Sequence, residues 1–420
     1  MGERLTAANE RARDDALGRL APLLPGLDVD ALADTTDDRR LHVLQVPDAL
    51  LDTLAGPDAV EAILTRHEHF WGHGGVSMSR ADEEGHLDPP RGAYRPGVAP
   101  GLHVLDVGVL AGLLGRQWTA IINSADRYDP ALADVCTDLT LATGSAVNTN
   151  IYLSYGEAEG FGAHWDSHDT LIVQVHGAKR WSVYEPLVLS AQRPWNDREI
   201  SDRPVWTGVL EVGMALLVPR GWGHRVEGSD DLTIHYTIGI NRLEVPALLR
   251  LLGDLVVDDR LDHPLPTSPF RGADDHPLLV APDDLARALD EWLEPTLIRR
   301  AVATHRARLH RRRFPALRTS FRAVARGDWS GLGLRLAAPS GVGVVPPAPG
   351  PGDDLRLAFD DRLVTIAAPA IDAVVQLADR RACHPGDLAP VVVDGSDERF
   401  RLARELVTAG VADVVVLDEP

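Results

Sequence analysis

Lysine is almost absent from this chain of 420 residues. Of its 42 basic side chains only Lys179 is a lysine, so the other 41 are arginines. Cysteine is also scarce, because Cys136 and Cys383 are the only two, and they lie far apart without a CxxC partner. That scarcity excludes a disulfide framework and a zinc finger, and it favours a reducing compartment.

Long apolar runs are missing as well. No stretch of 18 apolar residues occurs, so we predict no membrane-spanning helix. The first twenty residues are charged and have a helical pattern, without the apolar centre of a signal peptide. Together with the cysteine usage, this predicts a cytoplasmic protein that does not associate with membranes.

Acidic residues outnumber basic ones in the whole chain, but one segment is rich in arginine. The formal net charge is −20, which argues against broad nucleic-acid binding, and we expect no direct DNA binding. The segment from Pro295 to Gly327 nevertheless carries ten arginines and no acidic residue. We interpret it as a basic helix face packed against acidic surface of the same chain or of a twin subunit. RNA contact by residues 299–326, or contact with an acidic peptide, is the alternative.

The patterning divides the chain into four parts. Residues 1–40 are predicted to form a helical lead-in, and residues 41–243 contain short apolar strands separated by Gly, Pro and Asp, as in an antiparallel β domain. Residues 244–330 change to a helical period. After the Pro/Gly-rich stretch AAPSGVGVVPPAPGPGDD, residues 331–420 indicate a small α/β module with strands around two helices. The predicted strands are AVNTNIYLSY, TLIVQVHG, RWSVYEP and MALLVPRG, and the predicted helices of the β domain are DAVEAILTRHEHFW and DPALADVCTDLTLAT.

The stretch GFGAHWDSHDT contains a His-x-Asp pair. Residues two apart on a strand share a face, so His164 and Asp166 point the same way. His224 follows sixty residues later in VPRGWGH, where a strand ends in a tight turn. Two imidazoles and one carboxylate form the 2-His-1-carboxylate set of non-haem iron(II) oxygenases, which leaves coordination positions open for a cosubstrate and dioxygen.

A His-x-Asp pair alone is a weak signal in a chain with 16 histidines. His164 and His168 have the i, i+4 spacing of a zinc site on a helix, which is an alternative. Gly160, Gly162 and the β-rich sequence that follows argue against a helix here, so we place His168 at the rim of the site.

Lys179 follows the His-x-Asp pair by a strand and a turn. We predict that TLIVQVHG and KRWSVYEP form a hairpin that returns Lys179 to the metal face. There its ammonium group would pair with the far carboxylate of a dicarboxylic acid whose other end chelates the metal. An ordinary surface lysine in a hairpin is the alternative.

These segments resemble the JmjC-type cupin oxygenases, and above all the ribosomal-oxygenase branch. The resemblance covers residues 41–241 and is carried by NTNIYLSYGEAEGFGAHWD, Lys179 and VPRGWGH. It implies a mainly β catalytic core, a double-stranded β-helix of the jelly-roll or cupin type. It also implies a helical dimerisation region at 244–330, hence a homodimer, and a winged-helix-like α/β module at 331–420.

The resemblance also implies ligands for the cosubstrate 2-oxoglutarate. Asn150 and Tyr152 match an Asn-x-Tyr strand pattern twelve residues before the metal histidine. Tyr152 would donate a hydrogen bond to the carboxylate that Lys179 also binds. Thr170 and Thr237 fall where the family places further cosubstrate contacts.

The implied activity is that of an Fe(II)- and 2-oxoglutarate-dependent dioxygenase. It would use dioxygen to hydroxylate a side chain in a protein or peptide, a ribosomal protein by analogy. N-methyl-lysine demethylation, a non-catalytic metal- or peptide-binding cupin and a zinc-dependent cupin isomerase are the alternatives. The sequence LSYGEAEGF replaces a Thr-Pro-Pro-like turn at the substrate entrance, so the substrate does not carry over. Residues 352–420 hold 14 acids against 7 arginines, which favours protein contact over DNA binding.

Overall fold

The computed structural model describes residues 2–25, 27, 29, 40–66 except 55, 74–80, 93–96, 103–186, 200–242 except 229 and 230, 248–252, 298, 301, 302, 305, 321–336, 343–345, 355–359, 362–366, 370–379, 383–393, 396–408 and 412–417. The chain divides into two compact units, residues 13–242 and residues 1–12 together with 243–420. Most of the helical region predicted at 244–330, including most of the arginine-rich segment, lies outside the described residues.

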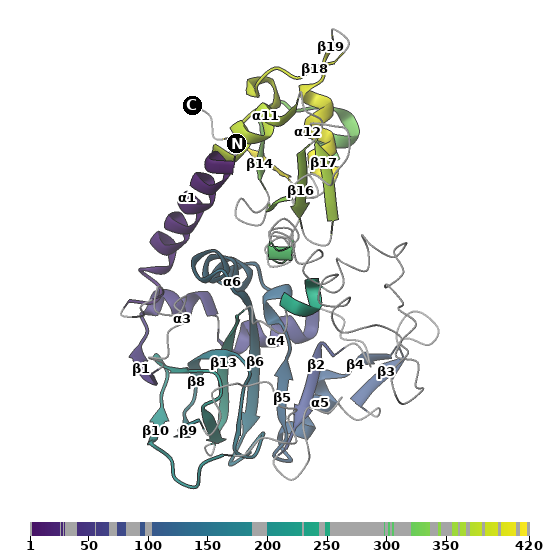
Figure 1. The fold of residues 1–420 in the computed structure, drawn as a ribbon. Helices are drawn as coiled ribbons and strands as arrows, with labels where there is room; N and C mark the ends of the chain where they lie inside the picture. The colour runs from purple at the N-terminus through teal and green to yellow at the C-terminus, as the bar shows by residue number, and fades with distance from the viewer. Residues whose placement is uncertain are drawn as a thin grey trace, which may run out of the picture. The chain divides into compact units, whose positions relative to one another are not determined.

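The unit of residues 13–242 is built from two antiparallel sheets (Figure 1). The large sheet has seven strands in the order β1 (His42–Gln45), β11 (Met214–Val218), β8 (Asp169–His176), β13 (Leu232–Asn241), β6 (Ala146–Tyr155), β5 (Thr119–Ile122) and β2 (Val76–Ser79). The small sheet has four strands in the order β10 (Trp206–Leu210), β9 (Lys179–Tyr184), β12 (Gly223–Glu227) and β7 (His164–Trp165). A short pair, β3 (Tyr94–Pro96) and β4 (His103–Leu105), stands apart from both sheets.

Alternation along the strands gives the large sheet two different faces. On β8, Leu171 and Val173 belong to the main hydrophobic core, whereas Ile172 packs with residues of the small sheet. On β13, Tyr236 and Ile238 likewise belong to the main core. The intervening residues of β6, β8 and β13 therefore face the small sheet, and most of the candidate site residues lie on this inner face.

Helices cover the outer face of the large sheet. They are α3 (Asp48–Leu54), α4 (Pro57–Arg66), α5 (Val107–Leu114), α6 (Pro130–Thr143) and the end of α1 (Gly2–Leu20), with a short 3₁₀ turn at Ala125–Arg127 before α6. The sequence sets the ends of α6: Asp129 caps it by accepting from Ala131 N at 2.8 Å, and Gly144 ends it in the left-handed conformation at φ 66°. Arg19 on α1 forms an ion pair with Asp138 on α6 at 2.6 Å, which ties the two helices together.

The second unit has its own hydrophobic core. Its described elements are the π-helical turn Phe321–Ala325, β14 (Leu332–Leu336), β15 (Gly343–Val345), β16 (Leu355–Phe359), β17 (Arg362–Ile366), α11 (Ile371–Asp379), the 3₁₀ turn Pro385–Asp387, β18 (Val392–Val393), β19 (Ser396–Asp397), α12 (Arg399–Thr408) and β20 (Ala412–Val416). Strand β14 pairs with β20, and β15, β16 and β17 form a sheet of their own.

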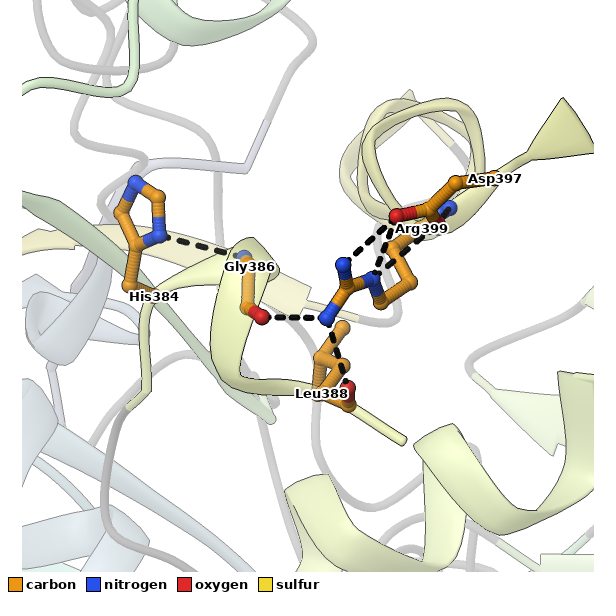
Figure 2. Close-up of polar contacts among 5 residues, drawn as sticks. All are labelled: His384, Gly386, Leu388, Asp397 and Arg399. Carbon is orange, nitrogen blue, oxygen red and sulfur yellow. Dashed lines mark hydrogen bonds and ion pairs between the residues drawn. The ribbon is translucent and has the colours of Figure 1, made fainter. Parts of the chain in front are cut away.

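Arg399 holds the loop before α12 in place, as Figure 2 shows. Its guanidinium donates to the carboxylate of Asp397 at 2.6 Å and to the carbonyl oxygens of Gly386 and Leu388. His384 caps the turn beside it, since its Nδ1 accepts from Gly386 N at 3.1 Å. These contacts satisfy backbone carbonyls that the irregular loop would otherwise leave unpaired.

The strand predictions agree with the structure, and the mainly antiparallel β core is consistent with a cupin or JmjC fold. One local prediction is wrong. Strands β8 and β9 do not form a hairpin, because β8 belongs to the large sheet and β9 to the small one. Gly177, at φ 65°, turns the chain from one sheet to the other. Lys179 still faces inward, but it does so from the opposite wall of the site.

Candidate metal centre and cosubstrate pocket

Strand pairing brings the two predicted metal histidines together. Strands β7 and β12 are antiparallel neighbours, and their register places His164 directly opposite His224. The ring centroids of the two imidazoles are 4.4 Å apart. One short strand pairing therefore brings together two residues that are far apart in the sequence.

Asp166 completes a cluster with these histidines just beyond the end of β7. One potential ligand atom from each of the three side chains lies within 4.8 Å of the others. Asp166 Oδ2 is 3.6 Å from His224 Nε2. The turn before β12 fixes this approach, because Trp222 N donates to Pro219 O at 3.1 Å and Gly221 N donates to Asp166 O at 2.8 Å. Gly221 has φ 79°, as the third position of a type II turn requires.

Backbone carbonyls orient both imidazoles. His164 Nδ1 lies 2.9 Å from Gly162 O, and His224 Nδ1 lies 3.4 Å from Trp222 O. A proton on each Nδ1 satisfies these carbonyls and leaves the lone pair on Nε2, which is how metal-ligating histidines are commonly fixed. Two neutral nitrogens and one carboxylate oxygen form a donor set that suits a divalent first-row metal such as Fe(II).

Lys179 lies in the same cavity as this cluster. It is the first residue of β9 and is only 3% exposed. Burial lowers the pKa of Lys179 to about 7, and no carboxylate among the described residues forms an ion pair with it. An enclosed ammonium group without an anion is unfavourable, so the pocket is suited to an anionic ligand.

Seven of the eight site residues predicted from the sequence line this cavity. Its lining residues are Thr119, Tyr152, Ala158, Gly160, Phe161, His164, Asp166, Thr170, Ile172, Lys179, Trp181, His224, Val226, His235 and Thr237. Asn150 is not one of them. Its Oδ1 accepts a hydrogen bond from Ser124 N at 2.9 Å. His168 lies outside the metal cluster, with its ring over Gly239, where a Cβ would come within 2.9 Å of it.

Tyr152 and Thr170 provide polar groups on the large-sheet wall. Burial, reinforced by the charge of Asp166, raises the pKa of the Tyr152 phenol, so it stays protonated and able to donate. Thr170 Oγ1 is enclosed and has no hydrogen-bond partner among the described residues. With Lys179 opposite, the pocket offers several polar hydrogen atoms to an anion.

Sequence reasoning missed two large residues of this pocket, Trp181 and His235. Trp181 is two residues after Lys179 on β9, and His235 is two residues before Thr237 on β13. Strand alternation from the predicted residues would have placed both on the inner face.

An ion pair at the rim ties the entrance loop to the small sheet. Arg225, on the outward face of β12, binds Glu159 with two hydrogen bonds of 2.7 and 2.9 Å. Gly228 N also donates to Ala158 O at 3.2 Å, and a Cβ at Gly228 would lie 2.3 Å from Gly156 O. The same loop carries Phe161, whose ring meets His164 edge-on at 5.3 Å. This loop therefore forms part of the cavity lining beside the metal cluster.

Residues 123–248 match the family described as JmjC domain. This part of the chain is similar to a JmjC domain. The match includes the three metal-cluster residues, Lys179 and the strands β6 to β13 that hold them, and it confirms the resemblance seen in the sequence.

Curated relatives of the JmjC region share about 30% identity. They include proteins named bifunctional lysine-specific demethylase and histidyl-hydroxylase NO66 from Drosophila mojavensis, 28% identical over 162 residues, and from Drosophila persimilis, 31% identical over 149 residues. These matches cover 37% and 34% of this chain but only 18% and 22% of the relatives. The chain thus matches less than a quarter of the length of either relative.

Two solved structures of YcfD from Escherichia coli share the fold. The X-ray structure of YcfD has a TM-score of 0.58 and 17% identity, and it covers 93% of this chain and 99% of that one. A second structure, described as a ribosomal oxygenase in complex with cobalt and 2-oxoglutarate, has a TM-score of 0.57 with the same coverage and identity. The likeness extends over both units of the chain.

No helix among the described residues is both long enough and apolar enough to cross a bilayer.

Proposed function

We propose that the protein is an Fe(II)- and 2-oxoglutarate-dependent dioxygenase that hydroxylates an amino-acid side chain in a protein or peptide. The observation that carries the proposal is the joint placement of His164, Asp166 and His224 beside the buried ammonium of Lys179. A metal site with open positions and an enclosed cation within one cavity fit a metal-chelating diacid.

The chain's own residues have distinct parts in this proposal. His164, Asp166 and His224 would hold the ferrous ion through Nε2 and carboxylate oxygen atoms. Lys179 and Tyr152 would bind the far carboxylate of 2-oxoglutarate. The bound metal, with 2-oxoglutarate and dioxygen, supplies the oxidising chemistry. The protein positions the reactants, while Ile172, Trp181 and Val226 keep water away from them.

A protein or peptide substrate is supported by two comparisons. One structural neighbour is described as a ribosomal oxygenase, and the curated relatives are named histidyl-hydroxylases. The metal cluster lies under an opening bordered by the loop at Ala158 to Phe161, through which a side chain of a macromolecule could enter. We therefore propose a ribosomal protein as the first substrate to test.

Demethylation of N-methyl-lysine is the second candidate, because the names of the same relatives include a lysine-specific demethylase activity. Both reactions need the same metal site and cosubstrate. They differ in product, since hydroxylation adds one oxygen atom whereas demethylation removes a methyl group as formaldehyde.

The proposal also covers the oligomeric state of the protein and its location in the cell. From the sequence pattern and the resemblance to the ribosomal-oxygenase branch, we propose a homodimer formed through the helical region 244–330, a winged-helix-like arrangement in 331–420, and a cytoplasmic location. The arginine-rich 299–326 segment would then contact acidic protein surface or RNA. Light scattering of the full chain tests the dimer, and a monomeric mass would contradict it.

The deciding experiment uses the full-length protein with Fe(II), 2-oxoglutarate and dioxygen. Ribosomal proteins and peptides are incubated with it, and intact masses and succinate are measured. We expect succinate together with a product that has gained one oxygen atom. Loss of a methylene mass with formaldehyde release would favour the demethylase. The absence of 2-oxoglutarate binding to the metal-loaded protein would refute both enzymatic candidates and favour a binding scaffold.

A further inference from the structure

His235 lines the same pocket as Lys179 and Tyr152, the two residues proposed to hold the far carboxylate of the cosubstrate. It is on β13, where the strand register pairs it with Tyr152 on β6. The two rings are stacked, with centroids 4.7 Å apart and planes within 4° of parallel. Trp181 meets His235 edge-on, with ring centroids 5.4 Å apart. The His235 ring therefore packs against two aromatic side chains and is only 4% exposed.

Its surroundings indicate which nitrogen carries the proton. Nδ1 is fully enclosed and has no hydrogen-bond partner among the described residues. A proton there would be a buried donor without an acceptor, which costs more than an unused lone pair. Burial and the nearby charge of Lys179 also hold the pKa of His235 well below its usual range, so the ring is neutral. The Nε2–H tautomer is therefore favoured, which leaves Nε2 to donate into the cavity that the ring lines.

We propose that His235 is a third, neutral donor to the far carboxylate of the bound dicarboxylate, acting through Nε2–H alongside Lys179 and Tyr152. This inference rests on the proposed function and identifies a ligand within that same site. A neutral donor adds a hydrogen bond without placing a second positive charge next to the Lys179 ammonium. Stacking fixes the Tyr152 and His235 rings together, so the two donors approach the carboxylate as one rigid unit.

The test compares two ligands on the full-length protein loaded with Mn(II), which supports binding without turnover. 2-Oxoglutarate carries the far carboxylate, whereas 2-oxopentanoate has the same chelating end but lacks it. His235→Phe keeps an aromatic ring on Tyr152 and removes the donor. His235→Gln restores an N–H near the position of Nε2. The matched control is His176→Phe, since His176 is a half-buried histidine at the end of β8 that does not line the cavity.

For His235→Phe we expect about a tenfold weaker Kd for 2-oxoglutarate by calorimetry, a change of about 1.4 kcal/mol, with the Kd for 2-oxopentanoate unchanged. His235→Gln should recover most of the loss, and His176→Phe should bind both ligands as the wild type does. Equal weakening for both ligands, or unaltered 2-oxoglutarate binding with the variant folded by circular dichroism, would overturn the role of His235. A wild-type protein with no preference for 2-oxoglutarate over 2-oxopentanoate would instead overturn the proposed function, and this inference with it.

Discussion

His164 and His224 face each other across a single pair of antiparallel strands, β7 and β12. The register of β7 against β12 therefore determines whether a metal centre exists. Because side chains alternate along a strand, a slip of one residue would replace His224 by the outward-facing Arg225. The turn at Pro219–Trp222 and its hydrogen bond to Asp166 O prevent such a slip.

Removing the carboxylate of the cluster should abolish metal binding while leaving the fold intact. Asp166→Ala takes away one of three ligands, and we expect at least about a 100-fold loss of Co(II) or Fe(II) affinity, above the range for supporting residues around a metal. Asp202→Ala, at an exposed position, is the matched control and should bind metal normally. Calorimetric metal titration measures the effect. Wild-type affinity in Asp166→Ala would show that the ligand set is wrong.

Gly177 should be far less tolerant of substitution than another glycine with the same backbone angle. Both Gly177 and Gly74 have φ 65°, but a Cβ at Gly177 would lie 2.5 Å from Leu232 O, whereas among the described residues, chain neighbours aside, no atom lies within 4 Å of a Cβ at Gly74. Gly74→Ala should cost about 1 kcal/mol of unfolding free energy from the left-handed conformation alone. Gly177→Ala should cost about 2–3 kcal/mol. Urea unfolding of the two variants checks this, and equal losses would mean that the close contact relaxes freely.

The metal cluster could be predicted from the sequence because its signals are local. His164 and Asp166 share a strand face, and His224 follows a Pro-x-Gly turn that can be recognised in the sequence. The strands at 146–155 and 169–176 could also be predicted from the sequence, because their apolar residues alternate or run continuously between turn residues.

What the sequence could not give was the assignment of strands to sheets. A turn of two residues between β8 and β9 usually indicates a hairpin, yet β9 pairs with β10 and β12 instead. The choice depends on long-range packing of Trp181 and Val183 against Ile172 and Leu216, which no local pattern records. His235 was missed for a related reason, since its importance comes from stacking on Tyr152 of another strand.

The ion pair between Glu159 and Arg225 should affect KM for a protein substrate more than it affects the free energy of unfolding. Glu159 and Arg225 are partly exposed, so we expect Glu159→Ala or Arg225→Ala to lower the unfolding free energy by only about 0.2–1 kcal/mol. Because the pair holds the loop that borders the opening, each variant should raise KM for a protein substrate several-fold, while the Kd for 2-oxoglutarate stays unchanged.

A double-mutant cycle separates the loop effect from the loss of either charge alone. If the pair acts as a unit, the double variant should be no worse than the single ones. Additive losses in KM would show that each charge contacts the substrate independently.

Lys179 should couple binding of the diacid to proton uptake. In the empty pocket burial lowers its pKa to about 7, so at pH 8 most molecules carry a neutral amine. A bound carboxylate favours the ammonium form and raises this pKa, so binding at pH 8 should take up a proton. The affinity for 2-oxoglutarate should therefore fall as the pH rises above about 7, and it should be nearly independent of pH well below 7, where the ammonium is already present.

Calorimetry in buffers of different ionisation enthalpy measures directly how many protons are taken up when 2-oxoglutarate binds. Lys179→Met should bind more weakly without proton uptake, and Lys179→Arg should also show no uptake because guanidinium stays charged. Proton uptake of the wild-type size in Lys179→Met would assign the titration to another group and remove Lys179 as the anchor of the diacid.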